Sequence, residues 1–310
     1  MRLLIAEHDH ARYSQLLSST HPTLSITASA APADLVQHAV HCPIWLGQPD
    51  LLADLLHKAP PPHWIQSTWA GITPLLATDR PRTYRLSRAV GIFGQVMAEY
   101  MVGHLLAHER RLLALPRTQA ERQWDTRPGG TLQGRTVLIV GIGDIGQQVA
   151  RMLEPFGVVL HGIASQAREQ SPFERVAPLS ALTECIPQAD YILNLLPDTP
   201  ATCDLYDATL LRRCKPSAVL VNAGRGTSVV DADLCTALVE GRLAAAVLDV
   251  CRQEPPPGDH LFWRTPNLLL TGHTAAPTSA PAMAQLFLHN LHAFQHGQSL
   301  RGEVDFSRGY

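Results

Sequence analysis

Short apolar runs alternate with helical patterns near the start of the chain. Four runs rich in β-branched or aromatic residues predict buried strands, and the amphipathic segments between them predict helices. Strands that alternate with helices form parallel sheets with helices on their faces. The predicted strands are residues 3–6, 44–46, 64–68 and 84–86, and the predicted helices are residues 33–40 and 51–58.

The same alternation resumes at Thr136 and continues to about residue 270. Each apolar run ends in polar or glycine-containing residues, which is typical of strands whose carboxyl ends form a ligand site. The length of 310 residues is sufficient for two domains with separate cores. We therefore predict an α/β fold with two parallel sheets. The later strands are expected at residues 136–140, 158–163, 189–196, 218–222, 244–250 and 267–270.

Residues 91–115 form the longest helical pattern in the chain. Val96, Tyr100 and Leu105 fall close to one face, and further methionines and leucines widen the apolar surface beyond that of a simple surface helix. This pattern favours a helix packed between domains or subunits. An ordinary core helix fits the periodicity equally well.

Composition and charge exclude several classes of function. The chain is 45% hydrophobic and 17% charged, and its formal net charge is −2. Such a chain has no excess of positive charge to attract a nucleic acid or a membrane surface, so neither is expected as a partner. The six cysteines form no CxxC pair, so we expect reduced thiols in a cytoplasmic protein. The fifteen histidines show no zinc-like spacing with cysteines or carboxylates, so no metal site is expected.

A glycine-rich turn stands between the strand at 136–140 and a helical segment. It reads Gly141-Ile142-Gly143-Asp144-Ile145-Gly146, the order that a dinucleotide site requires. Gly141 permits the tight turn, Gly143 lets a pyrophosphate approach the helix N-terminus, and Gly146 lets the helix pack on the strand. The strand and helix on either side favour a nucleotide site over a structural glycine turn.

Three later strand ends carry groups suited to the reduction of a 2-keto acid. Arg225 can hold a carboxylate and polarise a keto oxygen, and His273 can donate a proton to that oxygen. A carboxylate from Glu254 can orient the imidazole and favour its protonated form. Each residue alone also has an ordinary structural interpretation, but their joint placement after a glycine turn favours the catalytic one.

The run from Asn222 to Ala276 resembles the signature region of the D-isomer-specific 2-hydroxyacid dehydrogenases. The order and spacing of Arg225, Glu254 and His273 are similar to that family's Arg–Glu–His triad, and residues 93–112 resemble its glyoxylate/hydroxypyruvate reductase branch. The resemblance implies two Rossmann-like domains with the active site in the cleft between them. It also implies an enzyme that acts on a small 2-keto or 2-hydroxy acid with a nicotinamide cofactor.

The resemblance further implies the domain boundaries and the partner. Residues 1–95 with 280–310 would form a flavodoxin-like substrate-binding domain, and residues 96–279 the cofactor-binding domain. The helix at 95–113 would join two subunits in a homodimer.

Roles in binding are also implied. Trp45 would line the substrate pocket, and Ala70, Gly71 and Ile72 would hold the substrate carboxylate through their backbone N–H groups. The neighbours of the nicotinamide and its ribose would be Leu195, Pro197, Asn222 and Asp249.

The chain departs from the family pattern at three positions near the site. Gly272 stands where proline often precedes the active histidine, Cys251 where an aromatic residue is common, and Thr73 where aspartate is frequent. None removes a catalytic group, but together they leave the identity of the substrate open.

The end of the second cofactor-domain strand bears on the choice of cofactor. NAD enzymes usually carry an acidic residue there to bind the ribose hydroxyls, and residues 163–168 contain none. Ser165 and Arg168 are suited to receive a 2′-phosphate instead. We therefore expect NADP(H) to be preferred, with NAD(H) possible.

Two other functions remain compatible with the sequence. A nucleotide-sensing regulatory protein can use the same scaffold, because fold alone does not determine function. A dehydrogenase of a larger 2-hydroxy acid is the second alternative. The complete set of Arg225, Glu254 and His273 favours catalysis over sensing.

Overall fold

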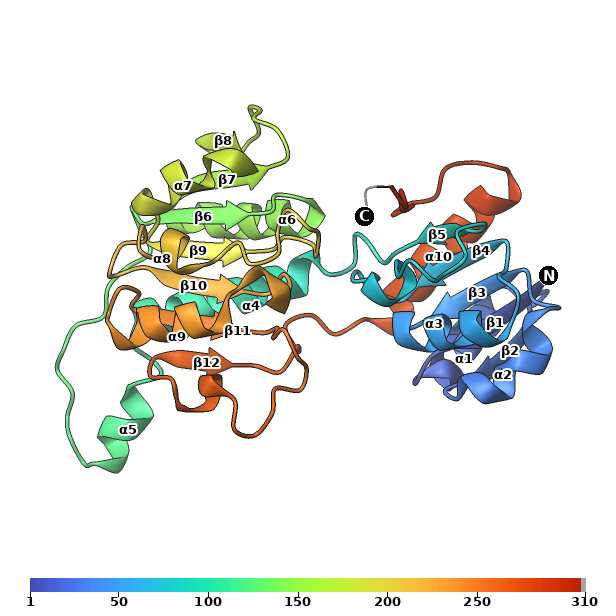
Figure 1. Cartoon of the computed structure of the whole chain (residues 1–310), viewed down its shortest axis with the longest axis horizontal. Coiled ribbons are helices and arrows are strands. Elements are labelled where there is room, and N and C mark those ends of the chain that lie inside the picture. Colours follow the sequence, from blue (N-terminus) through green and yellow to red (C-terminus); the bar gives the residue numbers. More distant parts are fainter. Residues whose placement is uncertain (308–310) are drawn as a thin grey trace. The chain divides into compact units, whose positions relative to one another are not determined.

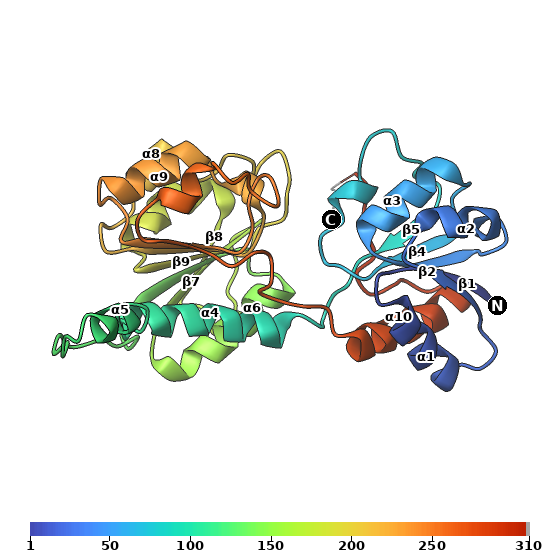
Figure 2. The ribbon, with the colours of Figure 1, turned by 90° about the horizontal axis from the view of Figure 1, so that it is seen from below.

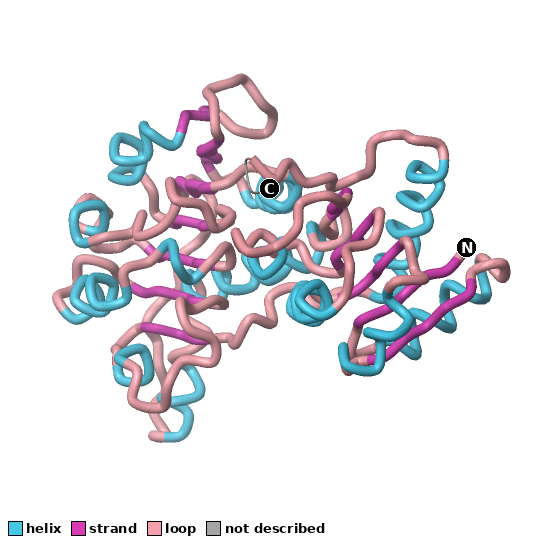
Figure 3. Tube along the Cα trace, turned by 45° about the vertical axis from the view of Figure 1, so that its right-hand side comes forward, coloured by secondary structure: helices cyan, strands magenta, loops and turns pink. Residues whose placement is uncertain are grey.

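The computed structural model describes residues 1–307, which form two compact units. Unit 1 comprises Met1–Ile92 and the chain from Thr278 onward, and unit 2 comprises Phe93–Pro277. Each unit contains one sheet in which all paired strands are parallel, with helices on its faces (Figures 1 and 3). The predicted α/β class with two parallel sheets is confirmed.

Unit 1 has a five-stranded sheet in the order β2-β1-β3-β4-β5. Helices α1 and α10 cover one face of it, and α2 and α3 cover the other (Figure 2). The strands are β1 (Arg2–Ala6), β2 (Ser25–Ser29), β3 (Ile44–Gly47), β4 (Trp64–Ser67) and β5 (Arg85–Ser87). The helices are α1 (His10–Thr20), α2 (Pro32–Ala39), α3 (Pro49–Lys58), the short 3-10 turn η1 (Thr73–Leu75) and α10 (Ala280–Gln295).

Helix α10 returns to unit 1 because aromatic and polar contacts hold it on the sheet. Trp64 of β4 stacks on Phe287 and Phe294, with ring centroids 5.3 and 5.2 Å apart. Asn290, which is fully buried, donates a hydrogen bond of 2.8 Å to the side chain of Gln66. These contacts join segments at opposite ends of the chain.

Unit 2 has a seven-stranded sheet in the order β12-β11-β10-β9-β6-β7-β8. The strands are β6 (Thr136–Val140), β7 (Val159–Ala164), β8 (Arg175–Pro178), β9 (Tyr191–Asn194), β10 (Val219–Asn222), β11 (Ala245–Leu248) and β12 (Leu268–Leu270). The helices are α4 (Gly94–Glu109), α5 (Leu115–Ala120), α6 (Asp144–Leu153), α7 (Leu182–Cys185), α8 (Ala208–Leu211) and α9 (Asp231–Val239). Helices α4 and α6 lie on one face, and α8 and α9 lie on the other (Figure 2).

The strand order of unit 2 reverses at β6. The chain proceeds from β6 outward through β7 to β8, and then continues from β9 toward the opposite edge. Ligands bind at the carboxyl ends of the strands beside such a reversal. The fold thus directs attention to the loops that follow β6 and β9.

The prediction of one helix from residue 91 to 115 is wrong. Helix α4 ends at Glu109, Arg111 adopts a left-handed φ of 58°, and a separate helix α5 begins at Leu115. Glu109 is held by partners distant in sequence, because Arg135 donates to it at 2.6 Å and the Tyr191 hydroxyl also binds it. Those contacts fix the end of the helix, and helical periodicity carries no sign of them.

Helix α1 and strands β2 and β8 are among the elements that were not predicted, because their sequences lack a clear apolar pattern. Helix α1 buries only Tyr13 and Leu17. Strands β2 and β8 lie at sheet edges, and neither is buried along its whole length. Edge elements of this kind give a weak hydrophobic signal.

Candidate active site

The glycine turn connects β6 to α6 as predicted. Gly141 has a φ of 105°, and a Cβ at this position would lie 2.9 Å from the carbonyl carbon of Leu195, so only glycine fits there. Gly143 is the N-cap of α6 and provides no capping side chain. A Cβ at Gly143 would meet no heavy atom within 4 Å, so open space lies in front of this residue.

These features fit a bound pyrophosphate. The N–H groups in the first turn of a helix have no acceptor within the helix, and the helix dipole favours an anion there. Asp144, Ile145 and Gly146 supply the first turn of α6. The turn therefore has the shape and the donors that a dinucleotide phosphate requires.

The three predicted catalytic residues follow adjacent strands of the same sheet. Asn222 of β10 pairs with Leu248 of β11, and Leu248 pairs with Leu270 of β12, so the three strands end level with one another. The loops that follow carry Arg225, Glu254 and His273. The sheet therefore presents these side chains at one edge.

Glu254 and His273 form a direct pair. His273 Nδ1 lies 2.7 Å from Glu254 Oε2, and the other carboxylate oxygen of Glu254 accepts a 2.8 Å hydrogen bond from the Cys251 backbone N–H. Both side chains remain partly exposed, at 49% for His273 and 37% for Glu254. Because Nδ1 faces the carboxylate, Nε2 is the nitrogen left to interact with a substrate.

The two groups shift each other's titration in opposite directions. The hydrogen bond to Glu254 raises the pKa of His273 above the ordinary imidazole value, while burial and the charge of Arg225 oppose the rise. Burial tends to raise the pKa of Glu254, but hydrogen bonds from His273 and Cys251 and the nearby positive charges outweigh it and hold that pKa low. The pair therefore favours an imidazolium beside a carboxylate.

Arg225 is fixed through its backbone. Its carbonyl accepts hydrogen bonds from Asn222 Nδ2 at 3.1 Å and from Ser228 Oγ at 2.7 Å. Asn194 donates to both of these side chains, at 2.9 and 2.8 Å. Asn194 and Asn222 are fully buried and Ser228 nearly so, which makes this a closed polar network that sets the position of the arginine.

The loop of Arg225 lies against the loop of Glu254. A Cβ at Gly226 would fall 1.9 Å from the Cys251 carbonyl carbon, so the close approach requires glycine. Arg252 links the two loops by donating to the carbonyl oxygens of Thr227 and Val229 at 3.1 and 3.0 Å. The charge of Arg225 thereby acts on both members of the Glu254–His273 pair.

His273 has an unusual backbone conformation. Its φ is 58° and that of Gly272 is 71°, so two successive residues are left-handed. A non-glycine residue in this region carries a strain of about 1–3 kcal/mol. Proline, with φ near −65°, cannot adopt the conformation of Gly272. The backbone conformation found at position 272 is therefore one that glycine can adopt and proline cannot.

The remaining predicted cofactor residues lie at the carboxyl edge of the unit 2 sheet. Leu195 follows β9 and donates its backbone N–H to Val140 at 2.8 Å, while Pro197 is exposed in the next loop. Ser165 and Arg168 are exposed in the loop after β7, where Arg168 donates to Gln170 at 2.6 Å. Asp249 follows β11 and is 4% exposed, because the segment around His273 closes over it.

In unit 1 the loop after β4 is held by its neighbours and has unused donors at its tip. Thr68 donates to Glu7 at 2.6 Å, and the Thr68 carbonyl accepts from Thr278 at 3.2 Å. Within residues 1–307, the backbone N–H groups of Ala70, Gly71 and Ile72 find no acceptor. These N–H groups are suited to bind a carboxylate.

The structure does not support a pocket-lining role for Trp45. Its side chain is 0% exposed in the core of unit 1, and its indole N–H donates to the Cys42 carbonyl at 3.0 Å. All four residues of β3 are buried, because helices cover both faces of this sheet, so neither face of the strand opens to a pocket. Trp69, which is 37% exposed, is the accessible aromatic residue near the loop after β4.

Sequence reasoning missed several residues that support the site. Asn194 and Ser228 lie in the network behind Arg225, and Thr271 and Tyr100 lie beside Asp249. A polar side chain at the carboxyl end of a buried strand was the available signal for Asn194. No local pattern marks Tyr100, because its partner lies in a distant segment.

Comparisons with known proteins identify the family. The model of the "D-isomer specific 2-hydroxyacid dehydrogenase, NAD binding domain" matches residues 102–275. The chain belongs to this family. The glyoxylate/hydroxypyruvate reductase A of Serratia proteamaculans is 31% identical over 248 residues, which cover 78% of this chain and 79% of that protein.

Solved structures agree with this assignment. A D-isomer specific 2-hydroxyacid dehydrogenase family protein from Aeromonas salmonicida has a TM-score of 0.93 and 40% identity, covering 98% of this chain and 99% of that one. An NADPH-dependent glyoxylate/hydroxypyruvate reductase from Sinorhizobium meliloti, in complex with NADP and sulfate, has a TM-score of 0.87 and 26% identity, covering 100% of this chain and 99% of that one. The predicted family and its reductase-like branch are confirmed.

This dehydrogenase is therefore an NAD(P)-dependent oxidoreductase that interconverts 2-keto and 2-hydroxy acids. Within residues 1–307, no helix is long and apolar enough to cross a membrane, and no group of three or more histidine, cysteine or acidic side chains is arranged to hold a metal ion. The cytoplasmic location and the site in an interdomain cleft stay predictions.

Proposed function

We propose that this dehydrogenase reduces a small 2-keto acid of the glyoxylate or hydroxypyruvate type to the D-2-hydroxy acid, with NADPH as the preferred reductant. The observation that carries the proposal is the pair of Glu254 and His273, 2.7 Å apart, at the sheet edge that also carries Arg225 and the glycine turn. The names of the Serratia and Sinorhizobium relatives support this substrate class.

His273 acts as the proton donor. In the imidazolium both ring nitrogens carry protons, and Nδ1–H is retained by Glu254. The proton on Nε2 is thus the one available to the keto oxygen, which becomes the hydroxyl of the product. The hydride for the carbonyl carbon would come from a nicotinamide cofactor held at the glycine turn. Glu254 keeps the ring oriented and stabilises its charged form before transfer.

Arg225 binds the keto acid. Its guanidinium offers a fixed fork of donors that suits a carboxylate and an adjacent carbonyl oxygen. The network of Asn194, Asn222 and Ser228 holds the Arg225 backbone carbonyl, so the backbone that carries the guanidinium is already ordered before the acid binds. The N–H groups of Ala70, Gly71 and Ile72 provide a second set of donors for the carboxylate.

NADPH preference rests on the loop after β7. Residues 163–168 contain no carboxylate that would repel a 2′-phosphate. Ser165 offers a hydroxyl and Arg168 a positive charge, both exposed to solvent. The NADP bound in the Sinorhizobium structure supports the same preference.

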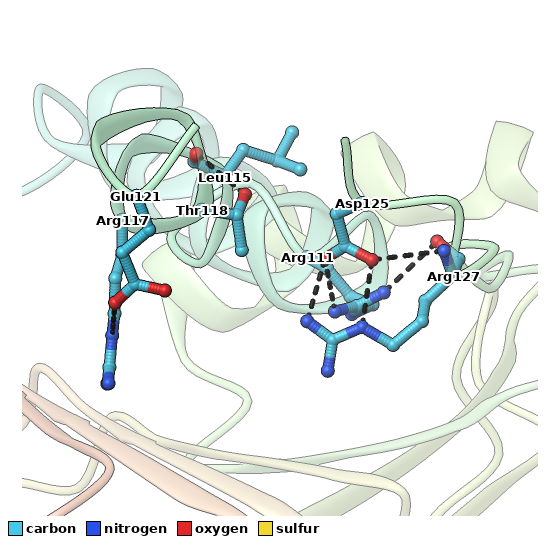
Figure 4. A network of polar contacts seen from close by, with 7 residues as sticks. All are labelled: Arg111, Leu115, Arg117, Thr118, Glu121, Asp125 and Arg127. Atoms are coloured by element: carbon cyan, nitrogen blue, oxygen red, sulfur yellow. Dashed lines mark hydrogen bonds and ion pairs between the residues drawn. The ribbon is translucent and has the colours of Figure 1, made fainter. Parts of the chain in front are cut away.

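We also propose a homodimer formed by α4 and the arm that follows it, residues 110–130. The arm exposes Leu112, Leu113, Leu115 and Trp124 at 49%, 64%, 41% and 93%, which is unfavourable for a monomer. A polar network holds its shape (Figure 4): Asp125 accepts from Arg111 at 2.9 Å and from Arg127 at 2.7 Å. An ordered apolar arm fits a subunit contact.

The proposed function is tested with a panel of 2-keto acids and each cofactor. Oxidation of NADPH on addition of glyoxylate or hydroxypyruvate, faster than with bulkier keto acids, is the expected result. Turnover only with bulkier acids would favour the dehydrogenase of a larger hydroxy acid. Tight NADPH binding with no turnover of any acid would favour the nucleotide sensor.

A further inference from the structure

The segment that carries His273 is tied to one buried carboxylate. Oδ1 of Asp249 accepts hydrogen bonds from Thr271 Oγ1 at 2.7 Å and from Thr274 N at 2.8 Å, and Ala275 N reaches both carboxylate oxygens at 3.2 and 3.1 Å. The backbone carbonyl of Asp249 accepts from His273 N at 2.6 Å. Residues 271–275 therefore fold around Asp249.

This carboxylate is connected to helix α4 by a chain of hydroxyl groups. The Tyr100 hydroxyl lies 2.8 Å from Thr271 Oγ1. A threonine hydroxyl has one proton, and that proton is directed to Asp249. Tyr100 must therefore be the donor to Thr271, and the chain runs from Tyr100 through Thr271 to Asp249.

The His273 segment requires such external support. Gly272 and His273 are both left-handed, so intrinsic backbone preference does not hold His273 in place. Strand β12 ends at Leu270 and α10 begins only at Ala280, so no regular element restrains the segment. Residues outside it must fix its conformation.

We propose that Tyr100 is a positioning residue for the proton donor His273 and acts through Thr271 and Asp249. The proposal rests on the function proposed above, in which His273 protonates the keto oxygen. In this proposal Tyr100 orients Thr271, and Thr271 with two backbone N–H groups fixes the carboxylate of Asp249. Asp249 in turn holds residues 271–275, through its carboxylate and its backbone carbonyl, in the conformation that keeps His273 beside Glu254. The chain enters from α4, a helix that contributes none of the residues predicted to touch cofactor or substrate.

The charged groups around His273 determine how its pKa would change if residues 271–275 were held less firmly. Glu254 and Asp249 act to raise the pKa of His273, and Arg225 acts to lower it. On the α4 side, His104 packs edge-on against Tyr100 at 4.4 Å between centroids. A looser segment weakens the contact with Glu254, which is the largest cause of the raised pKa, so that pKa should fall toward the ordinary imidazole value.

Tyr100→Phe tests this directly because it removes only the hydroxyl. We expect kcat for keto-acid reduction to fall roughly threefold to tenfold with little change in KM. The basic limb of the pH profile should also move to lower pH. A loss of kcat without any shift of that limb would show a merely structural effect and would overturn the proposal.

Tyr206→Phe is the matched control. Tyr206 lies in the core of the same unit and is fully buried, and its hydroxyl has no hydrogen-bond partner among residues 1–307. Removing that hydroxyl should leave kcat and the pH profile unchanged. An equal change in both variants would attribute the effect of Tyr100→Phe to altered packing and contradict the proposal.

A double-mutant cycle with Thr271→Val tests the route. If Tyr100 acts through Thr271, the double variant should be no slower than Thr271→Val alone, whereas additive losses would overturn the chain.

His273→Asn separates this inference from the proposed function. If the His273→Asn variant is inactive and the Tyr100→Phe variant is fully active, only the positioning role of Tyr100 is contradicted. If the His273→Asn variant is active, the assignment of His273 as the proton donor is contradicted.

Discussion

Nδ1 of His273 lies 2.7 Å from Oε2 of Glu254, and the contact raises the pKa of the histidine while that of the glutamate is held low. The pair is thus set to hold a proton above the pH at which a free imidazole of pKa 6.5 loses it. A proton donor for a carbonyl oxygen needs this property at neutral pH.

This pair predicts opposite pH dependences for the two directions of the reaction. Reduction needs the imidazolium, so kcat/KM should be highest below the raised pKa of His273 and fall as pH increases through it. Oxidation needs the neutral imidazole and should rise over the same range. Profiles of both directions measured in one buffer series check this, and parallel profiles would contradict it.

Replacing Glu254 with glutamine should expose its electrostatic role. Glu254→Gln keeps a side chain of the same size but removes the charge, so the pKa of His273 should fall. The basic limb of reduction should move to lower pH, and kcat at neutral pH should drop by roughly tenfold to a hundredfold. Glu184→Gln, at an exposed position on α7, is the control and should match the parent enzyme.

A carboxylate after β7 should reverse the cofactor preference. Ser165→Asp places a negative charge where a 2′-phosphate is proposed to bind, so kcat/KM for NADPH should fall by about tenfold or more, with NADH less affected. Ser165→Asn has nearly the same size without the charge and serves as the control. Equal losses for the two cofactors in Ser165→Asp would remove Ser165 from the proposed phosphate site.

The apolar arm should control the oligomeric state. Leu113→Asp combined with Trp124→Ser should give a monomer in analytical ultracentrifugation, because both side chains are proposed to be covered by the second subunit. Leu261→Asp changes another exposed leucine of unit 2, at 53% exposure, and should leave a dimer intact. A dimer that persists in the arm variant would place the contact elsewhere.

The parts of the candidate site that depend on local patterns could be located from the sequence alone. The turn from Gly141 to Gly146 needs a strand before it and a helix after it, and both are visible as periodicity. Arg225, Glu254 and His273 follow strands whose parallel arrangement brings their carboxyl ends together. Their placement at one sheet edge could therefore be predicted without a structure.

The remaining features depend on contacts between distant segments. Helix α4 ends where Arg135 and Tyr191 bind Glu109, and neither partner is close to it in sequence. Trp45 was expected in a pocket, but the hydrogen bond to Cys42 and the surrounding core bury it. The supporting residues behind Arg225 become apparent only when the strands are assembled.

The most direct test of the account is single-turnover reduction of glyoxylate or hydroxypyruvate by His273→Asn with NADPH bound. Asparagine lacks the titratable proton, so the rate should fall by roughly a hundredfold or more while the NADPH dissociation constant stays close to that of the parent enzyme. A variant that binds NADPH normally and reduces the keto acid at a near-parental rate would contradict the assignment of His273 as the proton donor.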